Sequence, residues 1–582
     1  MFGTDQTLLI RALNSTRQGY FPSYVGLRLI GSQLPRTEHS YLRRLILRRL
    51  SAGDQWRFRP YRLYKGERQS ANGPVAEYRE CLAPSPLTAV AEAVVLAQLS
   101  AVPAFSVPSR AFSYLWPRSP QAGASYEFFA EGYKRRNAEI GALLLSPNRV
   151  AVIMDLKGFY PSVDKGRIES SLKSLLATSD TEAPICTDAI LNFYSQVLSA
   201  GAGGIPIGPA SCHVLGHVVL KDVDTELTEA YGGNYFRYVD DIIVVCDRAD
   251  ASRAMSRVQE CVRAQGFQVN TDKTLVLDGQ EWRHNILRPD VDDEDDFRRF
   301  THDLAVYLAF HPGRGASVGQ MLADGGLSMP MRRVNALSTY SRFRYFIGRR
   351  HAQGGLPHAA GMVLARDRQF LDRGLRLKRT YENSLARLVQ ERREDSPNLR
   401  RWQVQRVRRV ANSLFYLRKF SEWSESSYLF DSFPELVEQR ALSSALSSGT
   451  VNPILAFYGR GPAAFAELWA EHGDRDARLA PLPSAITPAE LDSLITLRLH
   501  GVIGAEPLQS YGEDGGARLL RVVNQTMPVA RTSPDLSFED EFESLRLGTS
   551  DHEVSDLART RYSRSEGTTL EALSLSSAEY RS

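Results

Sequence analysis

The sequence predicts an α+β architecture over the first half of the chain and an all-α architecture beyond it. Residues 151–154 form a short apolar run, and residues 234–245 place aromatic and β-branched residues on both sides of a polar centre. Both segments are typical of strands. Past about residue 295 strand-like runs become rare and apolar residues recur at helical spacing. Because 582 residues exceed what one hydrophobic core usually serves, two or three domains are expected.

The composition is that of an ordinary globular protein, with 43% hydrophobic and 24% charged residues. No stretch approaches about 18 consecutive apolar residues, and the N-terminus lacks the layout of a signal peptide. We therefore expect no membrane segment and a cytoplasmic location. The cysteines stand at positions 81, 186, 212, 246 and 261, without CxxC spacing. In a reducing compartment this pattern favours buried free thiols over disulfides or a zinc site.

The segment Tyr238-Val239-Asp240-Asp241 places two adjacent carboxylates at the tip of an expected hairpin. Two carboxylates held so close repel each other, and a cation relieves that repulsion. A solvated loop tip would carry the same residues, so the pair alone leaves both interpretations open.

A third carboxylate, Asp155, follows an apolar run and is expected at the end of a buried strand. Taken alone, Asp155 could equally cap a helix. Phosphoryl transfer uses two divalent ions about 3.5 to 4 Å apart, and three carboxylates from adjacent strands can hold them. The combination of Asp155, Asp240 and Asp241 therefore predicts a two-metal catalytic site.

Two further segments accompany these carboxylates. Residues 203–211, rich in glycine and proline, permit a close approach of the backbone to a ligand and precede a helical pattern from Cys212 to Thr228. An ordinary loop before a helix would look similar. Lys273 follows a short strand, where it either meets a triphosphate, donates a proton to leaving pyrophosphate, or is an ordinary surface lysine.

In this order and spacing the motifs resemble the palm of a reverse transcriptase, over roughly residues 55 to 290. Asp155 begins the first palm motif, residues 204–211 resemble the second, Tyr238 to Asp241 form the third and residues 270–274 the fourth. The resemblance implies a right-hand polymerase with α+β fingers and palm. It also implies two Mg²⁺ ions, for which Mn²⁺ may substitute, bound by the three aspartates and the backbone carbonyl of Leu156.

The same resemblance implies a nucleotide site. Tyr160 falls where the family excludes a ribose 2′-hydroxyl, which favours dNTPs. Residues 59–84 resemble the two-stranded fingers hairpin whose basic residues clamp the triphosphate; the alternative for these residues is solvated surface charge. The nucleotide-binding residues implied in this way are Lys65, Arg79, Phe159, Tyr160, Ile207, Gly208, Pro209 and Lys273.

One residue of the second motif departs from the common pattern of the family and indicates which subfamily the chain resembles. Ile207 stands where retroviral, retron and intron enzymes usually carry Gln. Here the chain resembles the abortive-infection and related defence-associated bacterial reverse transcriptases, which implies a role against phage and a homo-oligomer. Some members of that group start DNA from a protein hydroxyl without a template, and others copy a non-coding RNA. The priming candidates are Tyr580, Tyr562 and Tyr41, with Tyr20 and Tyr24 as rivals.

The C-terminal half is expected to be helical throughout. Residues 340–347 and 413–420 echo each other, with aromatic residues and arginines at three-and-four spacing, which predicts paired helices. The resemblance points to a HEAT-like helical-repeat domain in place of a thumb. Basic residues crowd positions 366–419, and as a group they favour a channel for single-stranded DNA product over a solvated helix face.

The last fifty residues reverse this charge. Residues 533–582 hold eleven acidic and five basic residues, a net charge of −6. We expect a partly disordered tail that covers the basic channel. Within it, an amphipathic element able to dock is formed by Phe538, Phe542, Leu545 and Leu547.

Four parts are therefore predicted: a helical extension at residues 1–54, fingers and palm at 55–295, a helical-repeat domain at 296–530 and the acidic tail at 531–582. The predicted activity is DNA polymerisation from dNTPs. Three alternatives stay open, namely a retron-like or intron-derived enzyme that copies RNA, an RNA polymerase, and a non-catalytic scaffold that binds nucleic acid.

Overall fold

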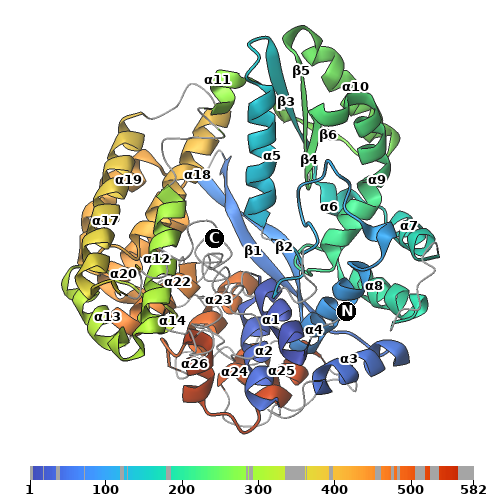
Figure 1. Ribbon diagram of the computed structural model, residues 1–582. Coiled ribbons are helices and arrows are strands. Elements are labelled where there is room, and N and C mark those ends of the chain that lie inside the picture. Colours follow the sequence, from blue (N-terminus) through green and yellow to red (C-terminus); the bar gives the residue numbers. More distant parts are fainter. Residues whose placement is uncertain are drawn as a thin grey trace. The chain divides into compact units, whose positions relative to one another are not determined.

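The computed structural model describes residues 4–16, 19–34, 40–70, 73–117, 123–127, 129–177, 185–283, 286, 293–334, 361, 364–391, 397–451, 461–473, 477–481, 486–504, 518–524 and 537–560. The chain forms two compact units, whose elements are labelled in Figure 1. The first unit comprises Met1–Thr16, Leu34–Pro60 and Cys81–Asp292. The second comprises Arg17–Gln33, Tyr61–Glu80 and Asp293–Ser582.

The first unit is built on an antiparallel sheet of order β4-β5-β3-β6. Its strands are β3 (Arg149–Leu156), β4 (Tyr235–Tyr238), β5 (Asp241–Asp247) and β6 (Val269–Asp278). Neighbouring residues of a strand point to opposite faces, and Val150, Ala151 and Val152 are all fully buried, so both faces of β3 are covered. The apolar run at residues 151–154 thus lies in the buried strand that the sequence predicts.

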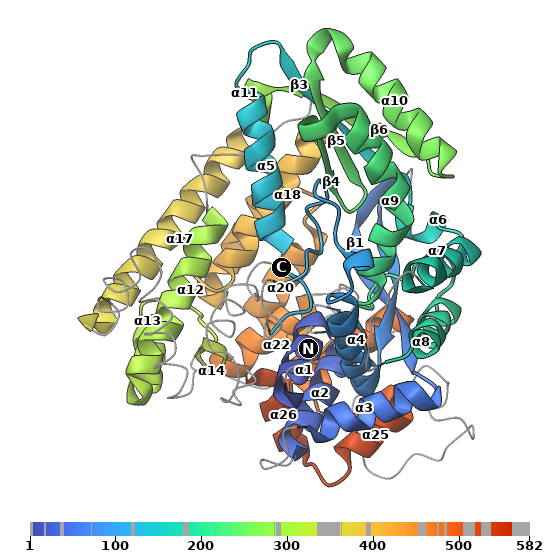
Figure 2. The ribbon, with the colours of Figure 1, turned by 45° about the vertical axis from the view of Figure 1, so that its right-hand side comes forward.

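Two helices pack against this sheet. α9 (Cys212–Tyr231) contacts β4, and α10 (Ala251–Ala264) contacts β3 and β5, as Figure 2 shows. The buried residues of α10 recur at helical spacing and include Ala254, Val258 and Cys261. Because α9 begins at Cys212, the helical pattern predicted from Cys212 to Thr228 is confirmed.

A second helical layer of this unit contains α1 (Asp5–Thr16), α3 (Tyr41–Ala52) and α4 (Pro86–Leu99). α4 packs against α1 and α3, and apart from Leu87 all its residues are buried, as expected for a helix that is apolar on every side. The remaining helices are α5 (Phe129–Leu143), α6 (Phe159–Ser162), α7 (Lys165–Ala177), α8 (Thr187–Ala200) and α11 (Gly279–Trp282).

The hairpin predicted at residues 59–84 is present as β1 (Phe58–Ser70) and β2 (Gly73–Pro84). Its base belongs to the first unit, where the N–H of Leu82 donates to the carbonyl of Ile207 at 2.7 Å. Tyr61–Glu80, the rest of the hairpin, belongs to the second unit.

Beyond residue 292 the described chain is mostly helical. Its helices are α12 (Asp293–Phe310), α13 (Gly315–Asp324), α14 (Met331–Val334), α17 (Asp367–Gln390), α18 (Pro397–Leu414), α19 (Ser427–Ser432), α20 (Val437–Ser448), α22 (Gly461–His472), α23 (Pro488–Leu499), α24 (Arg518–Asn524), α25 (Phe538–Arg546) and α26 (Asp551–Arg559). Successive helices pack on each other, for example α17 on α18 and α22 on α23. The HEAT-like repeat stays a prediction.

The all-α prediction is wrong at one point, because β7 (Thr450–Val451) and β8 (Arg478–Leu479) form a short parallel pair. The prediction of a helix over residues 413–420 is also wrong. Only Ser413 and Leu414 belong to α18, and the chain then turns, with the carbonyls of Ser413 and Leu414 accepting from residues 416 and 417. Its predicted partner, residues 340–347, lies outside the described residues.

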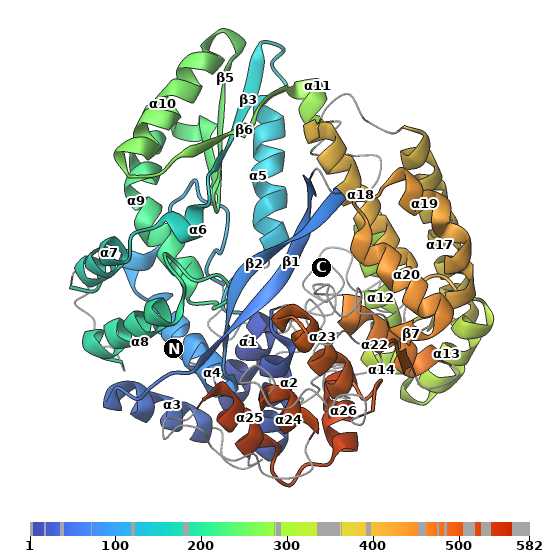
Figure 3. The same ribbon diagram turned by 180° about the vertical axis from the view of Figure 1, so that it is seen from behind.

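Part of the acidic tail is folded against α2 (Phe21–Gln33), which packs on α23, α25 and α26 (Figure 3). Phe538 and Phe542 are 2% and 0% exposed, so the predicted amphipathic element docks as α25. Leu547, however, lies after the helix end and is 58% exposed.

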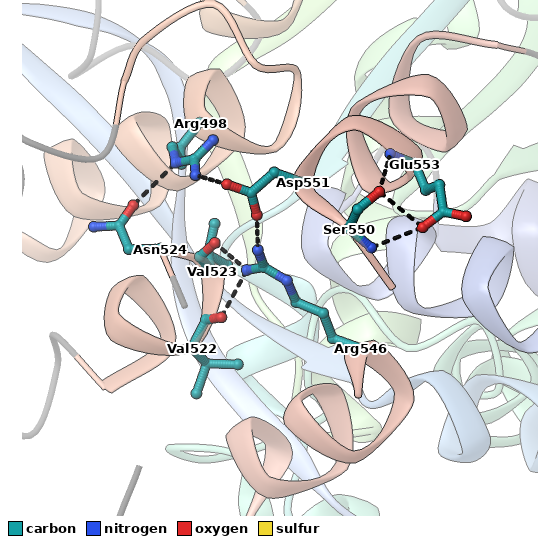
Figure 4. A network of polar contacts seen from close by, with 8 residues as sticks. All are labelled: Arg498, Val522, Val523, Asn524, Arg546, Ser550, Asp551 and Glu553. Atoms are coloured by element: carbon teal, nitrogen blue, oxygen red, sulfur yellow. Dashed lines mark hydrogen bonds and ion pairs between the residues drawn. The ribbon is translucent and has the colours of Figure 1, made fainter. Parts of the chain in front are cut away.

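The tail helices are held by a network of buried arginines. Arg546 is 1% exposed and donates to the carbonyls of Val522 and Val523 at the end of α24, while Asp551 bridges Arg546 and Arg498 (Figure 4). These acceptors compensate the guanidinium for its loss of water. The tail carboxylate Asp551 is thus engaged by arginines outside the predicted basic channel.

The five cysteines are free thiols, as predicted. Their burial is predicted correctly for Cys81, Cys212 and Cys261, whereas Cys186 is exposed and Cys246 is half-buried. None of the helices in the described part of the chain combines the length and the hydropathy that a bilayer crossing requires.

Candidate active site

The ends of two neighbouring strands bring the three predicted aspartates together. Asp241 opens β5 directly opposite Asp155 of β3, and Asp240 occupies the turn between β4 and β5. One carboxylate oxygen of each aspartate lies within 4.8 Å of the others, and all three side chains are half-buried. Within the described residues, they are the one group of acidic, histidine or cysteine side chains so arranged.

The turn that carries Asp240 has a rare backbone conformation. Val239 has a φ of 56°, in the left-handed region that β-branched residues seldom adopt. Its N–H donates to Ser113 Oγ at 3.0 Å, and its carbonyl accepts from Arg237 Nη1 at 2.9 Å. Hydrogen bonds to both the N–H and the carbonyl of Val239 thus offset the strain of this turn.

Arg237 is itself held by a buried ion pair. Its Nε and Nη2 each lie 2.6 Å from an oxygen of Asp224, and its side chain is 1% exposed. Tyr235 donates to the same carboxylate at 2.8 Å, and His217 Nδ1 lies 3.1 Å from Arg237 Nη2. Burial opposes the charge of Arg237, but Asp224 more than offsets this and raises the pKa of Arg237, so the pair stays ionic.

The electrostatics of the aspartates suit a cation. Burial, and then the negative charges of Asp241 and Asp155, raise the pKa of Asp240 to about 6. Lys273 Nζ lies 2.8 Å from Asp155 Oδ2, and Asn270 Nδ2 lies 3.4 Å from the same oxygen. A cluster of carboxylate oxygens is the donor set that Mg²⁺ and Mn²⁺ prefer, so the residues fit the predicted cofactor.

Leu156 follows Asp155 and is 1% exposed. Its N–H donates to the carbonyl of Asp240 at 3.1 Å, which fixes the end of β3 against the Asp240 turn. The part predicted for its own carbonyl, as a metal ligand, stays a prediction.

Tyr160 lies on α6, and its backbone is fixed by the glycine-rich loop. The N–H of Ile205 donates to the Tyr160 carbonyl at 2.8 Å. Gly204 has a φ of 57°, and a Cβ there would lie 2.2 Å from the same carbonyl oxygen. This glycine therefore permits close approach to the chain's own backbone, where the sequence suggested approach to a ligand.

Gly208 plays the same part on the other side of the loop. Its φ is 122°, and a Cβ there would lie 2.3 Å from the carbonyl oxygen of Leu82. Ile207 is half-buried and Pro209 is buried. The loop at residues 204–209 thus joins the Tyr160 segment to the base of the β1–β2 hairpin.

Other predicted residues are placed individually. Phe159 is buried and contacts Tyr160 edge to face, with ring centroids 5.3 Å apart. Lys65 lies 3.5 Å from Glu77 across the hairpin, and Arg79 is exposed. Both belong to the second unit, so their part in nucleotide binding stays a prediction.

The priming candidates also differ in their surroundings. Tyr41, on α3, is 48% exposed. Its rivals Tyr20 and Tyr24 are 4% exposed each. Tyr562 and Tyr580 lie outside the described residues.

The predicted basic channel is partly neutralised by ion pairs. Four of its cations pair with carboxylates at 2.5 to 3.0 Å, namely Arg373 with Asp303, Lys378 with Glu422, Arg400 with Glu435 and Arg418 with Glu382. Others are exposed, including Arg368, Arg376, Arg379 and Arg387 on α17. Binding of nucleic acid by this region stays a prediction that rests on the exposed set.

Sequence reasoning missed a buried carboxylate at the glycine-rich loop. Glu92 of α4 is 1% exposed, and its Oε1 accepts from Ser211 Oγ at 2.5 Å and from Ser211 N–H at 3.0 Å. Burial raises the pKa of Glu92 to about 7. Its signal in the sequence is that it is the one charged residue within residues 86–99.

Comparisons with known proteins agree with this geometry. Residues 91–286, which contain the three aspartates, match the family described as reverse transcriptase (RNA-dependent DNA polymerase). The chain is 31% identical over 185 residues to the retron Mx162 reverse transcriptase of Myxococcus xanthus, a match that spans 27% of this chain and 36% of that protein. It is also 31% identical over 176 residues to the retron Mx65 reverse transcriptase of the same organism, spanning 28% of this chain and 39% of that protein. The chain thus matches well under half the length of these curated relatives.

Proposed function

We propose that the protein is a DNA polymerase of the reverse-transcriptase type, which adds dNTPs to a hydroxyl group by two-metal phosphoryl transfer. The observation that supports this best is the convergence of Asp155, Asp240 and Asp241 within 4.8 Å, inside the segment that matches the family. A non-catalytic scaffold would have no need of three carboxylates held together against their mutual repulsion.

Asp155, Asp240 and Asp241 would hold two Mg²⁺ ions, with the Leu156 carbonyl as a further ligand. When bound, such ions activate the attacking hydroxyl and stabilise the charge of the leaving pyrophosphate. Lys273 pairs with Asp155. It would become available to a triphosphate if a cation took its place on that carboxylate. Tyr160 would exclude a ribose 2′-hydroxyl and so select dNTPs.

The decisive experiment is dNTP incorporation on primed poly(rA), with Asp240→Asn as the inactive variant. We expect a loss of at least about 10³-fold, because one of three metal-binding carboxylates becomes neutral. Asp247→Asn is the matched control, since Asp247 is an exposed aspartate at the other end of β5. Equal activity of the wild type and Asp240→Asn would refute the proposal.

Two modes of template use are in competition. Ile207 favours synthesis without a template or on a non-coding RNA, as in the defence-associated group. The similarity to two retron reverse transcriptases favours ordinary copying of RNA. Sequencing the product made with and without poly(rA) separates template-independent synthesis from copying of the added RNA, because copying makes oligo(dT) and template-independent synthesis makes strands unrelated to poly(rA).

For initiation on protein, Tyr41 is the best supported described candidate, because its ring is 48% exposed. Mass spectrometry after nuclease treatment would find a nucleotide on Tyr41, and Tyr41→Phe would abolish that adduct. A nucleotide on Tyr562 or Tyr580 would assign priming to the tail. A function in phage defence predicts that bacteria expressing the wild type, but not Asp240→Asn, plate phage less efficiently.

A further inference from the structure

The hydroxyl of Tyr160 has a specific partner in the first unit. It lies 3.1 Å from Nδ1 of His213, which stands in the first turn of α9. One turn further along the same helix, a Cβ on Gly216 would lie 3.7 Å from the Tyr160 hydroxyl, so this oxygen rests on the surface of α9. The backbone of Tyr160 is held by Ile205, as described above, and its ring is therefore anchored at both ends.

His213 is held in turn by an aromatic cluster. Its ring stacks on Tyr114, with centroids 3.6 Å apart and planes inclined by 9°, and Tyr126 packs on both rings edge to face. The Tyr126 hydroxyl donates to the carbonyl of Ala210, just before α9. Burial lowers the pKa of His213 to about 3, so the imidazole is neutral near pH 7 and its Nδ1 can accept from the Tyr160 hydroxyl.

The ring so anchored belongs to α6, which follows directly after β3, the strand that carries Asp155. Burial raises the pKa of Tyr160, and the charge of Asp240 is among the further causes. A side chain that selects a sugar by steric exclusion must not rotate away when a 2′-hydroxyl presses on it. Tyrosine has two soft torsions, and a hydrogen bond at the far end of the ring restricts both.

We propose that His213 is the positioning residue for sugar selection: it holds the Tyr160 hydroxyl, and thereby keeps the ring where it rejects ribonucleotides. This inference rests on the proposed function. The Tyr160 ring supplies the bulk that excludes a 2′-hydroxyl, and the bond from its hydroxyl to His213 keeps that bulk in place. The selection of dNTPs therefore depends on a residue of α9.

The test measures the ratio of dATP to ATP use in a competition assay, and the ratio of their dissociation constants with Ca²⁺ in place of Mg²⁺. The variants are Tyr160→Phe, which removes only the hydroxyl, His213→Ala, the double variant, and Tyr160→Ala, which removes the ring. His213→Asn is the conservative variant, because its side-chain oxygen takes the place of Nδ1. Glu229→Ala, on the exposed face of α9, controls for general effects on the helix.

We expect Tyr160→Phe and His213→Ala each to lower the discrimination about fivefold, the worth of one hydrogen bond. The double variant should fall no further than the single ones, because all three lack the same bond. His213→Asn should retain most of the discrimination, and Tyr160→Ala should lose the most. A merely structural His213 would instead lower the use of both nucleotides equally and leave the ratio unchanged, which would overturn the inference, as would additive losses in the double variant.

The binding measurement keeps this inference separate from the proposed function. A wild type that binds dATP in preference to ATP through His213 but incorporates neither would refute the polymerase and support the inference. If the wild type incorporates dATP and His213→Ala has the same ratio of dATP to ATP use, the polymerase is supported and the inference is refuted. Equal binding of both nucleotides by the wild type would overturn the inference outright.

Discussion

Lys273 Nζ lies 2.8 Å from Asp155 Oδ2, so a lysine of β6 occupies one of the carboxylates that the proposed metals need. The two side chains are 39% and 16% exposed, and solvent weakens such a pair to about 1 kcal/mol or less. A cation that binds Asp155 through Oδ2 would compete with this lysine. If the proposed metals bind, the contact would add a small cost to their binding and would free a positive charge.

Lys273→Met should lower the Mg²⁺ concentration at half-maximal activity by about two- to fivefold, because no lysine competes for Asp155. The maximal rate should fall as well, since a positive charge for the triphosphate is lost. A titration of dNTP incorporation with Mg²⁺ measures both effects. Lys273→Arg keeps the charge and should behave like the wild type in the metal titration; a higher Mg²⁺ requirement for Lys273→Met would contradict the competition.

Breaking the buried ion pair of Asp224 with Arg237, next to the Asp240 turn, should lower the stability of the fold. Asp224→Asn leaves the charge of Arg237 without its partner, and removing one member of a buried pair typically costs about 3 to 5 kcal/mol. We expect a marked fall in the thermal midpoint and in activity, because Arg237 also holds the Val239 carbonyl. Asp250→Asn breaks a pair whose members are 81% and 44% exposed and should change the midpoint little. Similar effects of the two variants would show that the pair of Asp224 with Arg237 does not stabilise the fold.

The glycine-rich loop offers a matched pair of substitutions. Gly204→Ala would place a Cβ 2.2 Å from the Tyr160 carbonyl at a φ of 57°, so the loop and α6 must shift apart. Gly203→Ala, one residue earlier, meets nothing within 4 Å. Gly204→Ala should lower the activity on dNTPs ten-fold or more, because the strain is on the order of 1 to 3 kcal/mol. Gly203→Ala should change the activity by no more than about twofold. Equal activities would remove the loop's role in fixing Tyr160.

These sites show how far the sequence could lead. The positions of Asp155, Asp240 and Asp241 follow from strand patterns and motif spacing, because a strand delivers its last residue to one edge of the sheet. The partners Glu92, His213 and Asp224 could not be found in this way. Each is a polar residue within an apolar or helical stretch, and its function depends on a contact with a distant segment that only the fold brings near.

The tail illustrates the same limit. Its net charge predicts a partly disordered segment, and its apolar spacing predicts a docking element at Phe538 and Phe542, which are indeed buried. The two capping boxes at Ser537 and Ser550 are not predicted. Local charge is a poor guide where an acidic helix meets buried arginines. The pairing of Asp540 with Arg518 and of Asp551 with Arg546 neutralises acidic charge inside the second unit.

Removal of the Arg546 side chain tests whether these contacts anchor the tail. Arg546→Ala leaves the carbonyls of Val522 and Val523 without a donor, and a buried acceptor left in this state costs about 1 to 3 kcal/mol. We expect a lower thermal midpoint and faster proteolytic cleavage of the segment that follows residue 536. Arg521→Ala, on the exposed face of α24, is the control and should leave both unchanged. Unaltered proteolysis of Arg546→Ala would show that Arg546 does not anchor α25, and would leave that role to Phe538, Phe542 and the pair of Asp540 with Arg518.

Glu92 makes the stability of the first unit depend on pH. Its pKa is raised from 4.5 to about 7 by burial, so the folded state binds its proton more tightly than the unfolded state does. The stabilising contribution of the protonated group is therefore complete below about pH 4.5 and is lost as the pH rises towards 7, with no further change above that value. The full shift corresponds to a loss on the order of 3 kcal/mol. Glu92→Gln cannot ionise, so its thermal midpoint should fall less than that of the wild type between about pH 5 and pH 8. Parallel pH profiles for the two proteins would show that Glu92 titrates normally in the folded state.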